Sequence, residues 1–136
     1  MIYLNTSAFV AMTAHARVHL PEEACGLIAG TVSESGDKFI QKVYYLENVD
    51  HSPEHFTICP QDQLSAVKDM RRNGFQLLGN WHSHPQTPAR PSEEDIRLAH
   101  DSKASYLILS LSGSEPILNA YHIADGQAER EPIRFV

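Results

Sequence analysis

The stretch from residue 76 to residue 95 reads QLLGNWHSHPQTPARPSEED and combines three kinds of local structure. Its apolar first part, residues 76–81, predicts a buried strand that runs straight into His82 and His84. Prolines punctuate the residues that follow the second histidine, which predicts a stiff loop. Ser92 is a good N-cap residue and predicts a helix that continues to about residue 102. A strand, a stiff loop and a helix therefore follow one another here.

The histidines in this stretch have the spacing of metal ligands. Side chains two apart on a strand point to the same face, so His82 and His84 can converge on one ion. Asp95 follows eleven positions after His84. In the first turn of a helix its ionised form is favoured, and a ligand must be ionised. Three protein ligands leave the fourth tetrahedral position of a zinc ion open, which is the arrangement of a catalytic zinc. The spacing therefore predicts a small metallohydrolase.

Ser92 and Asp95 also allow a purely structural interpretation. A serine at the N-cap and an acidic residue three positions later form a capping-box-like pair that closes the start of a helix. The same serine hydroxyl would lie near the water on the metal. Both interpretations of Ser92, as a cap and as a participant in the reaction, stay open at this point.

A candidate general base lies far upstream, at the start of an apolar strand, in the segment Pro21-Glu22-Glu23-Ala24. The residues alone do not decide whether Glu22 or Glu23 points inward. The other histidines of the chain are interpreted as surface or core residues without a function. They are His15, His19, His51, His55, His100 and His122.

The rest of the chain alternates helices and strands that are joined mostly by short turns. Helices are predicted over residues 6–19 and 60–73, and further strands over residues 24–32, 38–48, 106–110, 117–123 and 131–136. Residues 49–60 predict a loop that leads into a short strand, and Asp125-Gly126 predicts the turn between the last two strands. No linker or repeat interrupts the pattern, so residues 1–136 are expected to form a single α/β (α+β) sandwich with a mostly antiparallel sheet.

Composition excludes several classes of function. The chain has a net charge of −6 and no cluster of basic residues, which argues against a nucleic-acid-binding protein. There is no signal-peptide pattern and no apolar run of about 18–20 residues, so neither secretion nor a membrane span is expected and a cytoplasmic protein is the default. Only two cysteines occur, Cys25 and Cys59. They are interpreted as small buried side chains, with a disulfide between them as the alternative.

Taken together, these residues resemble the JAMM, or MPN+, zinc metallopeptidases, and in particular their short prokaryotic members. The signature of that family is an upstream Glu, then His-x-His, ten residues and Asp, with a Ser three residues before the Asp. In this chain its positions are Glu23, His82, His84, Ser92 and Asp95. The segment from Pro21 to Gly30 is similar to the family's opening strand, and this similarity selects Glu23 over Glu22. The segments 48–56 and 121–126 resemble the family as well, so the likeness covers nearly the whole chain.

The resemblance implies a fold akin to the cytidine deaminases, with a curved, mixed, mostly antiparallel sheet flanked by helices. It implies that His82, His84 and Asp95 bind Zn²⁺. Glu23 would be the general base that takes a proton from the zinc-bound water and passes it to the leaving amine. Ser92 would stabilise the oxyanion.

The resemblance also implies a substrate, which is a peptide or isopeptide bond after the C-terminal glycine of a ubiquitin-like sulfur-carrier protein. Such a tail would bind as an added strand beside a sheet edge. The chain has no room for the two large insertions with which eukaryotic deubiquitinases hold ubiquitin. Three alternatives remain: a non-catalytic MPN scaffold that binds a partner, a DNA-repair-associated relative, and a deubiquitinase-like or general small-peptide hydrolase with the same site.

Overall fold

One mixed sheet of eight strands runs through the protein, as seen in a computed structural model that describes all 136 residues. The strands are β1 (Ile2–Leu4), β2 (Cys25–Val32), β3 (Lys38–Leu46), β4 (Gln76–His84), β5 (Ser105–Ser110), β6 (Ile117–Ala124), β7 (Gln127–Glu131) and β8 (Ile133–Phe135). The helices are α1 (Thr6–Val18), α2 (Pro60–Arg72) and α3 (Glu93–Arg97). The strand order is β7-β6-β5-β4-β2-β3-β1-β8, which places β4 in the interior of the sheet.

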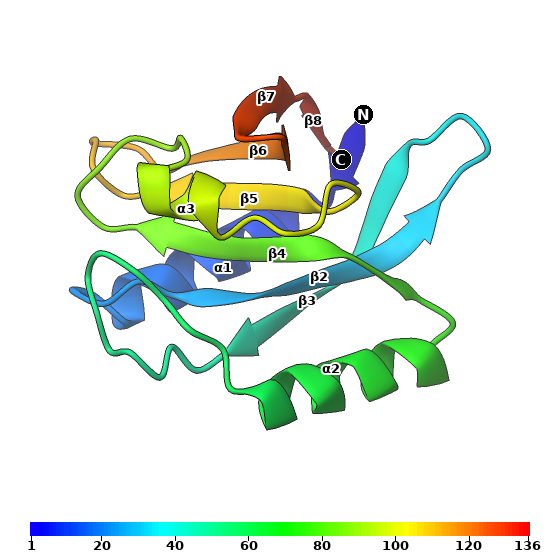
Figure 1. Cartoon of the computed structure of the whole chain (residues 1–136), viewed down its shortest axis with the longest axis horizontal. Helices are drawn as coiled ribbons and strands as arrows, with labels where there is room; N and C mark the ends of the chain where they lie inside the picture. The colour runs from blue at the N-terminus through cyan, green and yellow to red at the C-terminus, as the bar shows by residue number, and fades with distance from the viewer.

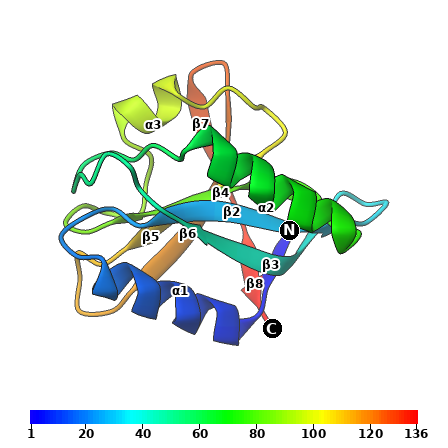
Figure 2. The same cartoon turned by 90° about the horizontal axis from the view of Figure 1, so that it is seen from below.

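The pairing of the strands confirms the predicted fold class. The pairs β2–β3, β2–β4, β5–β6 and β6–β7 are antiparallel, whereas β4–β5, β1–β3 and β1–β8 are parallel. Figure 2 shows α1 on one face of the curved sheet and α2 and α3 on the other. The two chain ends lie close together at β1 and β8 (Figure 1).

The face of the sheet under α1 carries the larger apolar core. Its centre is Trp81, which is fully buried and packs with residues of α1, among them Met12 and Ala16. The Trp81 indole Nε1–H donates to the backbone oxygen of Tyr44 at 3.1 Å, so its polar atom is satisfied inside the core. Because side chains alternate along a strand, a β4 that buries Trp81 on this face turns both neighbouring histidines to the opposite one.

The opposite face carries a smaller core under α2. Leu27, Ala29 and Tyr44 of the sheet pack there against Ala66 and Met70 of the helix. The third helix, α3, has no buried residue. The sheet is therefore sealed by α2 on this side but not by α3, and the region between these two helices stays accessible.

The elements agree with the sequence predictions except near three turns. The helix that begins after Ser92 ends at Arg97, not near residue 102. Within the predicted helix, the Asp101 carboxylate accepts the backbone N–H of Lys103 at 2.9 Å, a local bond that competes with helical hydrogen bonding. The short strand expected within residues 49–60 is reduced to a single bridge between Asn48 and Ile58.

At the C-terminal end, β8 lies within the predicted strand over residues 131–136, but the prediction missed β7, which precedes it. Asp125 and Gly126 both have positive φ, 53° and 73°, which makes the tight hairpin turn that starts β7 directly at Gln127. The last strand, β8, pairs in parallel with β1. The sequence analysis did not predict β1, which has only three residues. Strands this short have too few residues to show an alternating pattern.

Two further expectations can be compared with the structure. Cys25 and Cys59 are both free thiols, which rules out the alternative of a disulfide between them. Cys25 is buried as expected, whereas Cys59 is only half-buried, at the N-cap position of α2. None of the three helices combines the length and the apolar composition that crossing a membrane requires.

Gly26 provides a test of how closely β2, β3 and β4 pack. A side-chain carbon at this position would overlap the backbone oxygen of Tyr44 and would lie 2.6 Å from Trp81 Nε1. We expect Gly26→Ala to lower the free energy of unfolding by about 1–3 kcal/mol, because the new methyl group overpacks the sheet. Urea denaturation followed by tryptophan fluorescence measures this change.

Gly113→Ala is the matched control, since an added carbon there meets its nearest atom at 3.9 Å. This variant should stay within about 0.5 kcal/mol of the original chain. Equal losses in the two variants would contradict the close packing at Gly26.

Candidate metal centre

The end of β4 holds His82 and His84 on the same face of the sheet, as the sequence predicts, and turns Ser83 to the other face. The Ser83 hydroxyl accepts the backbone N–H of Ala24 at 2.8 Å, and the Ser83 N–H donates to the Ala24 oxygen at 2.9 Å. Ser83 is completely buried. The residue between the two histidines therefore binds the residue that follows Glu23, which ties the two halves of the candidate site together.

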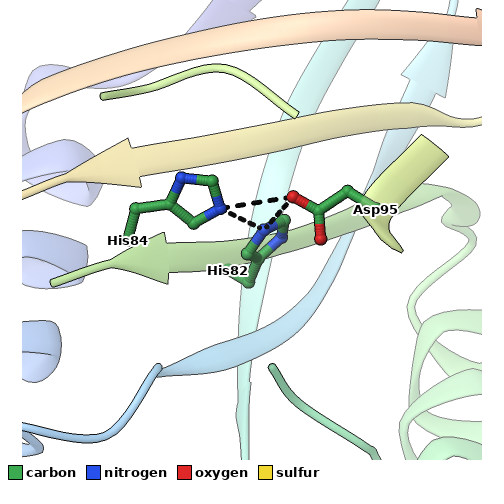
Figure 3. A group of neighbouring side chains, drawn as sticks. All are labelled: His82, His84 and Asp95. Atoms are coloured by element: carbon green, nitrogen blue, oxygen red, sulfur yellow. Dashed lines mark hydrogen bonds and ion pairs between the residues drawn. The ribbon is translucent and has the colours of Figure 1, made fainter. Parts of the chain in front are cut away.

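Asp95 of α3 meets both histidines. Its Oδ2 lies 3.2 Å from Nε2 of His82 and 3.2 Å from Nε2 of His84, and these two nitrogens are 3.1 Å apart (Figure 3). Ligands of a tetrahedral zinc at about 2.0–2.1 Å are themselves separated by about 3.3–3.4 Å. The three atoms are thus arranged as three corners of such a site, and the residues fit a zinc ion. No other part of the chain brings three ligand-type side chains together in this way.

The start of α3 aims the Asp95 carboxylate. The Ser92 hydroxyl accepts the Asp95 N–H at 3.0 Å, and Asp95 Oδ2 accepts the Ser92 N–H at 2.9 Å, which completes a capping box. The oxygen that closes the cap is the same one that faces the histidines. The capping interpretation of the pair is therefore confirmed, and it does not compete with the ligand geometry. Ser92 uses its hydroxyl only as an acceptor here, so its proton remains free for another partner.

The charges in the cluster stabilise one another. Burial raises the pKa of Asp95, but hydrogen bonds with His82 and His84 outweigh this and hold the pKa well below its usual range. Burial lowers the pKa of His82. Burial also lowers the pKa of His84, but Asp95 and the backbone oxygen of Pro88 reverse this effect, and the net shift is upward. Asp95 is consequently an anion at neutral pH, as a metal ligand must be.

His84 has a partner that fixes its ring. Its Nδ1–H donates to the backbone oxygen of Pro88 at 2.9 Å, which leaves Nε2 as the free nitrogen facing the cluster. Pro88 lies in the proline-rich loop, and the flanking carbonyls of that loop are held in the same manner. Ser110 donates to the oxygen of Thr87 at 2.6 Å, and Tyr121 donates to the oxygen of Ala89 at 2.7 Å.

Sequence analysis missed these loop-holding residues. Asn119 also donates to the Ala89 oxygen, at 3.0 Å, from its place beside Tyr121 on β6. Ser110 and Asn119 are polar residues in mostly apolar strands, and this is the one signal that could have drawn attention to them. Nothing in the sequence indicates which carbonyl each one would bind.

Glu23, not Glu22, points inward. Its backbone N–H donates to the Ser52 oxygen at 2.8 Å, and its own carbonyl accepts the side-chain amide of Asn48 at 3.0 Å. The Glu23 side chain is 4% exposed, and its Oε1 is buried without a hydrogen-bond partner. Glu22 instead pairs with His51 at the surface, 3.0 Å away.

Burial raises the pKa of Glu23 to about 8, an effect that the nearby charge of His84 opposes and that of Asp95 reinforces. Glu23 directly precedes Ala24, and the two hydrogen bonds between Ala24 and Ser83 hold this part of the chain beside the end of β4 that carries both histidines. A carboxylate with a pKa near neutrality is suited to both accept and return a proton. Its unpartnered oxygen is the kind of buried polar atom that calls for a missing donor, such as a water molecule in the site.

A cavity of about 470 Å³ opens beside the cluster, and both His82 and Asp95 line it. Most of its other walls are apolar and come from the sheet, from the segment before α2 and from the end of α3. They include Leu27, Phe56, Ile58, Leu98, Ile108 and Ile123. The cavity occupies the region between α2 and α3 that no helix seals.

The remaining histidines take no part in the cluster. His51 and His55 are in hydrogen-bonding contact with carboxylates at the surface, and the rings of His15 and His19 lie 4.2 Å apart in a tilted arrangement. None of them comes together with two further ligand-type groups.

Two named proteins are similar to nearly the whole of this chain. The CysO-cysteine peptidase of Mycobacterium tuberculosis is 33% identical over 127 residues, which is 93% of this chain and 85% of that protein. The probable TtuB-protein conjugate cleaving protease of Thermus thermophilus is 31% identical over 128 residues, which is 93% of this chain and 79% of that protein.

A solved structure is similar along the whole length. The solution structure of a protein from Desulfitobacterium hafniense has a TM-score of 0.92 and 49% sequence identity, and the match covers 100% of this chain and 93% of that one. The family model described as prokaryotic homologs of the JAB domain matches residues 5–123. The chain therefore belongs to the prokaryotic JAB-domain family, the short prokaryotic branch of the JAMM/MPN+ peptidases that its sequence resembles.

Proposed function

We propose that the protein is a zinc-dependent metallopeptidase that hydrolyses the bond after the C-terminal glycine of a ubiquitin-like, sulfur-carrier-type protein. The observation that carries this proposal is the convergence of His82, His84 and Asp95, which the hydrogen bonds between Ser83 and Ala24 join to the strand end that bears the buried, unpartnered carboxyl group of Glu23. A site for a metal next to a candidate base is the arrangement that hydrolysis of an amide needs.

The residues of the site divide the work in the proposed reaction. His82, His84 and Asp95 would hold the zinc, which would polarise the scissile carbonyl and lower the pKa of a bound water to about 7. Glu23 takes a proton from the attacking water and delivers it to the leaving amine. Ser92, whose hydroxyl proton has no acceptor within the protein, donates to the oxygen that becomes negatively charged.

The substrate assignment is supported by the relatives and by the cavity. Two of the similar proteins carry the names of a CysO-cysteine peptidase and a TtuB-protein conjugate cleaving protease. The cavity beside the cluster has the apolar walls that an extended protein tail can contact. Glycines at the end of such a tail let its backbone approach the buried metal closely.

The topology limits how a tail can bind as an added strand. The free edges of the sheet are β7 and β8, whereas β4 is already paired on both sides, with β2 and β5. A tail next to the cluster therefore has to pair with chain outside the sheet. Residues 56–58, which line the cavity, are the proposed partner.

The proposed function is tested by cleavage of candidate carrier proteins. Zinc-loaded protein is incubated with ubiquitin-like carriers that bear an extension after the final glycine, one with a single amino acid and one with a lysine-linked protein. Mass spectrometry should show carrier ending at glycine in at least one case. If every carrier stays intact while short peptides are cut, the protein is a general peptidase instead.

His84→Ala tests the metal site. Two protein ligands hold zinc poorly, so we expect the purified variant to contain almost no zinc after dialysis, whereas the original chain should retain one zinc per molecule. Elemental analysis measures the metal directly. His100→Ala is the control, because His100 lines the cavity but belongs to no ligand group. Zinc retained by His84→Ala would refute the assignment.

Glu23→Gln separates an enzyme from a binding scaffold. The amide keeps the size of the side chain but cannot accept a proton, so we expect zinc content to be unchanged and turnover to fall by a factor of about 10²–10⁴. The half-buried neighbour Glu22, which pairs with His51, supplies the matched control, Glu22→Gln, which should keep its rate. If the protein is a non-catalytic scaffold, both variants bind the partner normally, and neither they nor the original chain show turnover.

Ser92→Ala and Ser92→Gly distinguish the two roles of this residue. Both variants lack the hydroxyl donor, so we expect both to lose about 3 kcal/mol of transition-state stabilisation. Only Ser92→Ala should also lose about 1 kcal/mol of stability, because glycine is nearly as good an N-cap as serine. Rates and thermal denaturation of the two variants are compared. A normal rate in Ser92→Gly would leave capping as the only role of Ser92.

A further inference from the structure

The two histidines of the cluster are supported in different ways. His84 donates its Nδ1–H to the Pro88 oxygen, which is the common way in which a metal-binding imidazole is oriented. His82 has no such bond. Its Nδ1 has no hydrogen-bond partner, even though the residue is only 3% exposed and water cannot reach this atom freely. The hydrogen-bond contacts of His82 are all made by Nε2, the nitrogen that would bind the metal, so another contact must set the plane of the ring from the Nδ1 side.

An aromatic side chain covers that ring. Phe56 stacks on His82 with ring centroids 4.8 Å apart and an angle of 26° between the planes. The other ring close to His82 is His84, at 4.9 Å and a tilted angle of 58°. Offset stacking between aromatic rings is favourable and restricts rotation about the last side-chain bond.

The segment that carries Phe56 is itself held in place. The buried Asn48 side chain accepts the Thr57 N–H at 3.2 Å and donates to the His55 oxygen at 3.1 Å. The same amide group donates to the backbone oxygen of Glu23. Hydrogen bonds on both sides of Phe56 thus fix it relative to the strand end that carries the candidate base.

From these contacts we infer that Phe56 is the positioning residue for His82, and that ring stacking takes the place of the missing hydrogen bond. The inference rests on the proposed metal site. It assigns to the segment before α2 a role in building that site, and not only in lining the cavity. Phe56 does not touch a metal itself and acts only through the orientation of the imidazole.

Three variants test this role. Phe56→Leu keeps an apolar side chain but removes the ring, and Phe56→Tyr keeps the ring. Phe75→Leu is the control, because Phe75 packs against the α2 core and stacks on no histidine. The dissociation constant for zinc is measured by competition with a chromogenic chelator. Thermal denaturation of the metal-free variants reports any general loss of fold.

We expect Phe56→Leu to weaken zinc binding by about 10-fold or more, as loss of the partner of a metal-binding histidine does. Phe56→Tyr and Phe75→Leu should bind zinc like the original chain. In the metal-free protein, the NMR signal of the His82 ring Hδ2 should move downfield in Phe56→Leu and stay in place in Phe56→Tyr, since a stacked ring shields it.

The outcomes separate this inference from the proposed function. Absence of zinc binding in the original chain would overturn the metal site itself. Normal zinc affinity in Phe56→Leu would overturn the role of Phe56 and leave the metal site standing. If zinc affinity is weakened in Phe56→Leu and equally weakened in Phe56→Tyr, the stacking role is also overturned, because the loss then has a cause other than removal of the ring.

Discussion

The pairing of Ser83 with Ala24 is the contact on which the arrangement of the site depends. It consists of two hydrogen bonds in a fully buried position, one from each backbone N–H. Ser83 lies between the two histidines, and Ala24 directly follows Glu23. Strand alternation then places the histidines on one face of β4, while the same two bonds hold the end of β2 next to them. The candidate ligands and the candidate base are thereby positioned by one short piece of backbone.

Around this contact, the irregular parts of the chain are held by side chains that bind carbonyl oxygens. The oxygens of three successive loop residues, Thr87 to Ala89, accept hydrogen bonds from β4, β5 and β6. Asn48 does the same for the segment before α2. Buried backbone groups outside helices and strands need such partners, and these partners make the loops rigid. Rigidity matters here because ligand atoms must stay within a few tenths of an ångström of the geometry that a metal requires.

The helix α3 contrasts with this rigidity. It has no buried residue, so apolar packing contributes little to its position. The contacts of Asp95 with the two histidines connect it to the sheet, and the capping box with Ser92 fixes the Asp95 side chain for these contacts. The same lack of apolar packing leaves the cavity open between α2 and α3. A short, polar-anchored helix therefore carries one candidate ligand, Asp95, and at the same time leaves the cavity beside the cluster open.

The amino-acid sequence by itself determined the class of fold, the two long helices and the positions of His82, His84 and Asp95, because alternation along a strand and N-cap chemistry act over a few residues. It also narrowed the base to Glu22 or Glu23. Only the tertiary structure decided that Glu23 is buried, since that depends on pairing between β2 and β4, which are about 50 residues apart in the chain. The same holds for Phe56 on His82, for Tyr121 on the proline-rich loop and for the short strands β1 and β8, whose partners are distant in sequence. Local propensity cannot specify contacts of this kind.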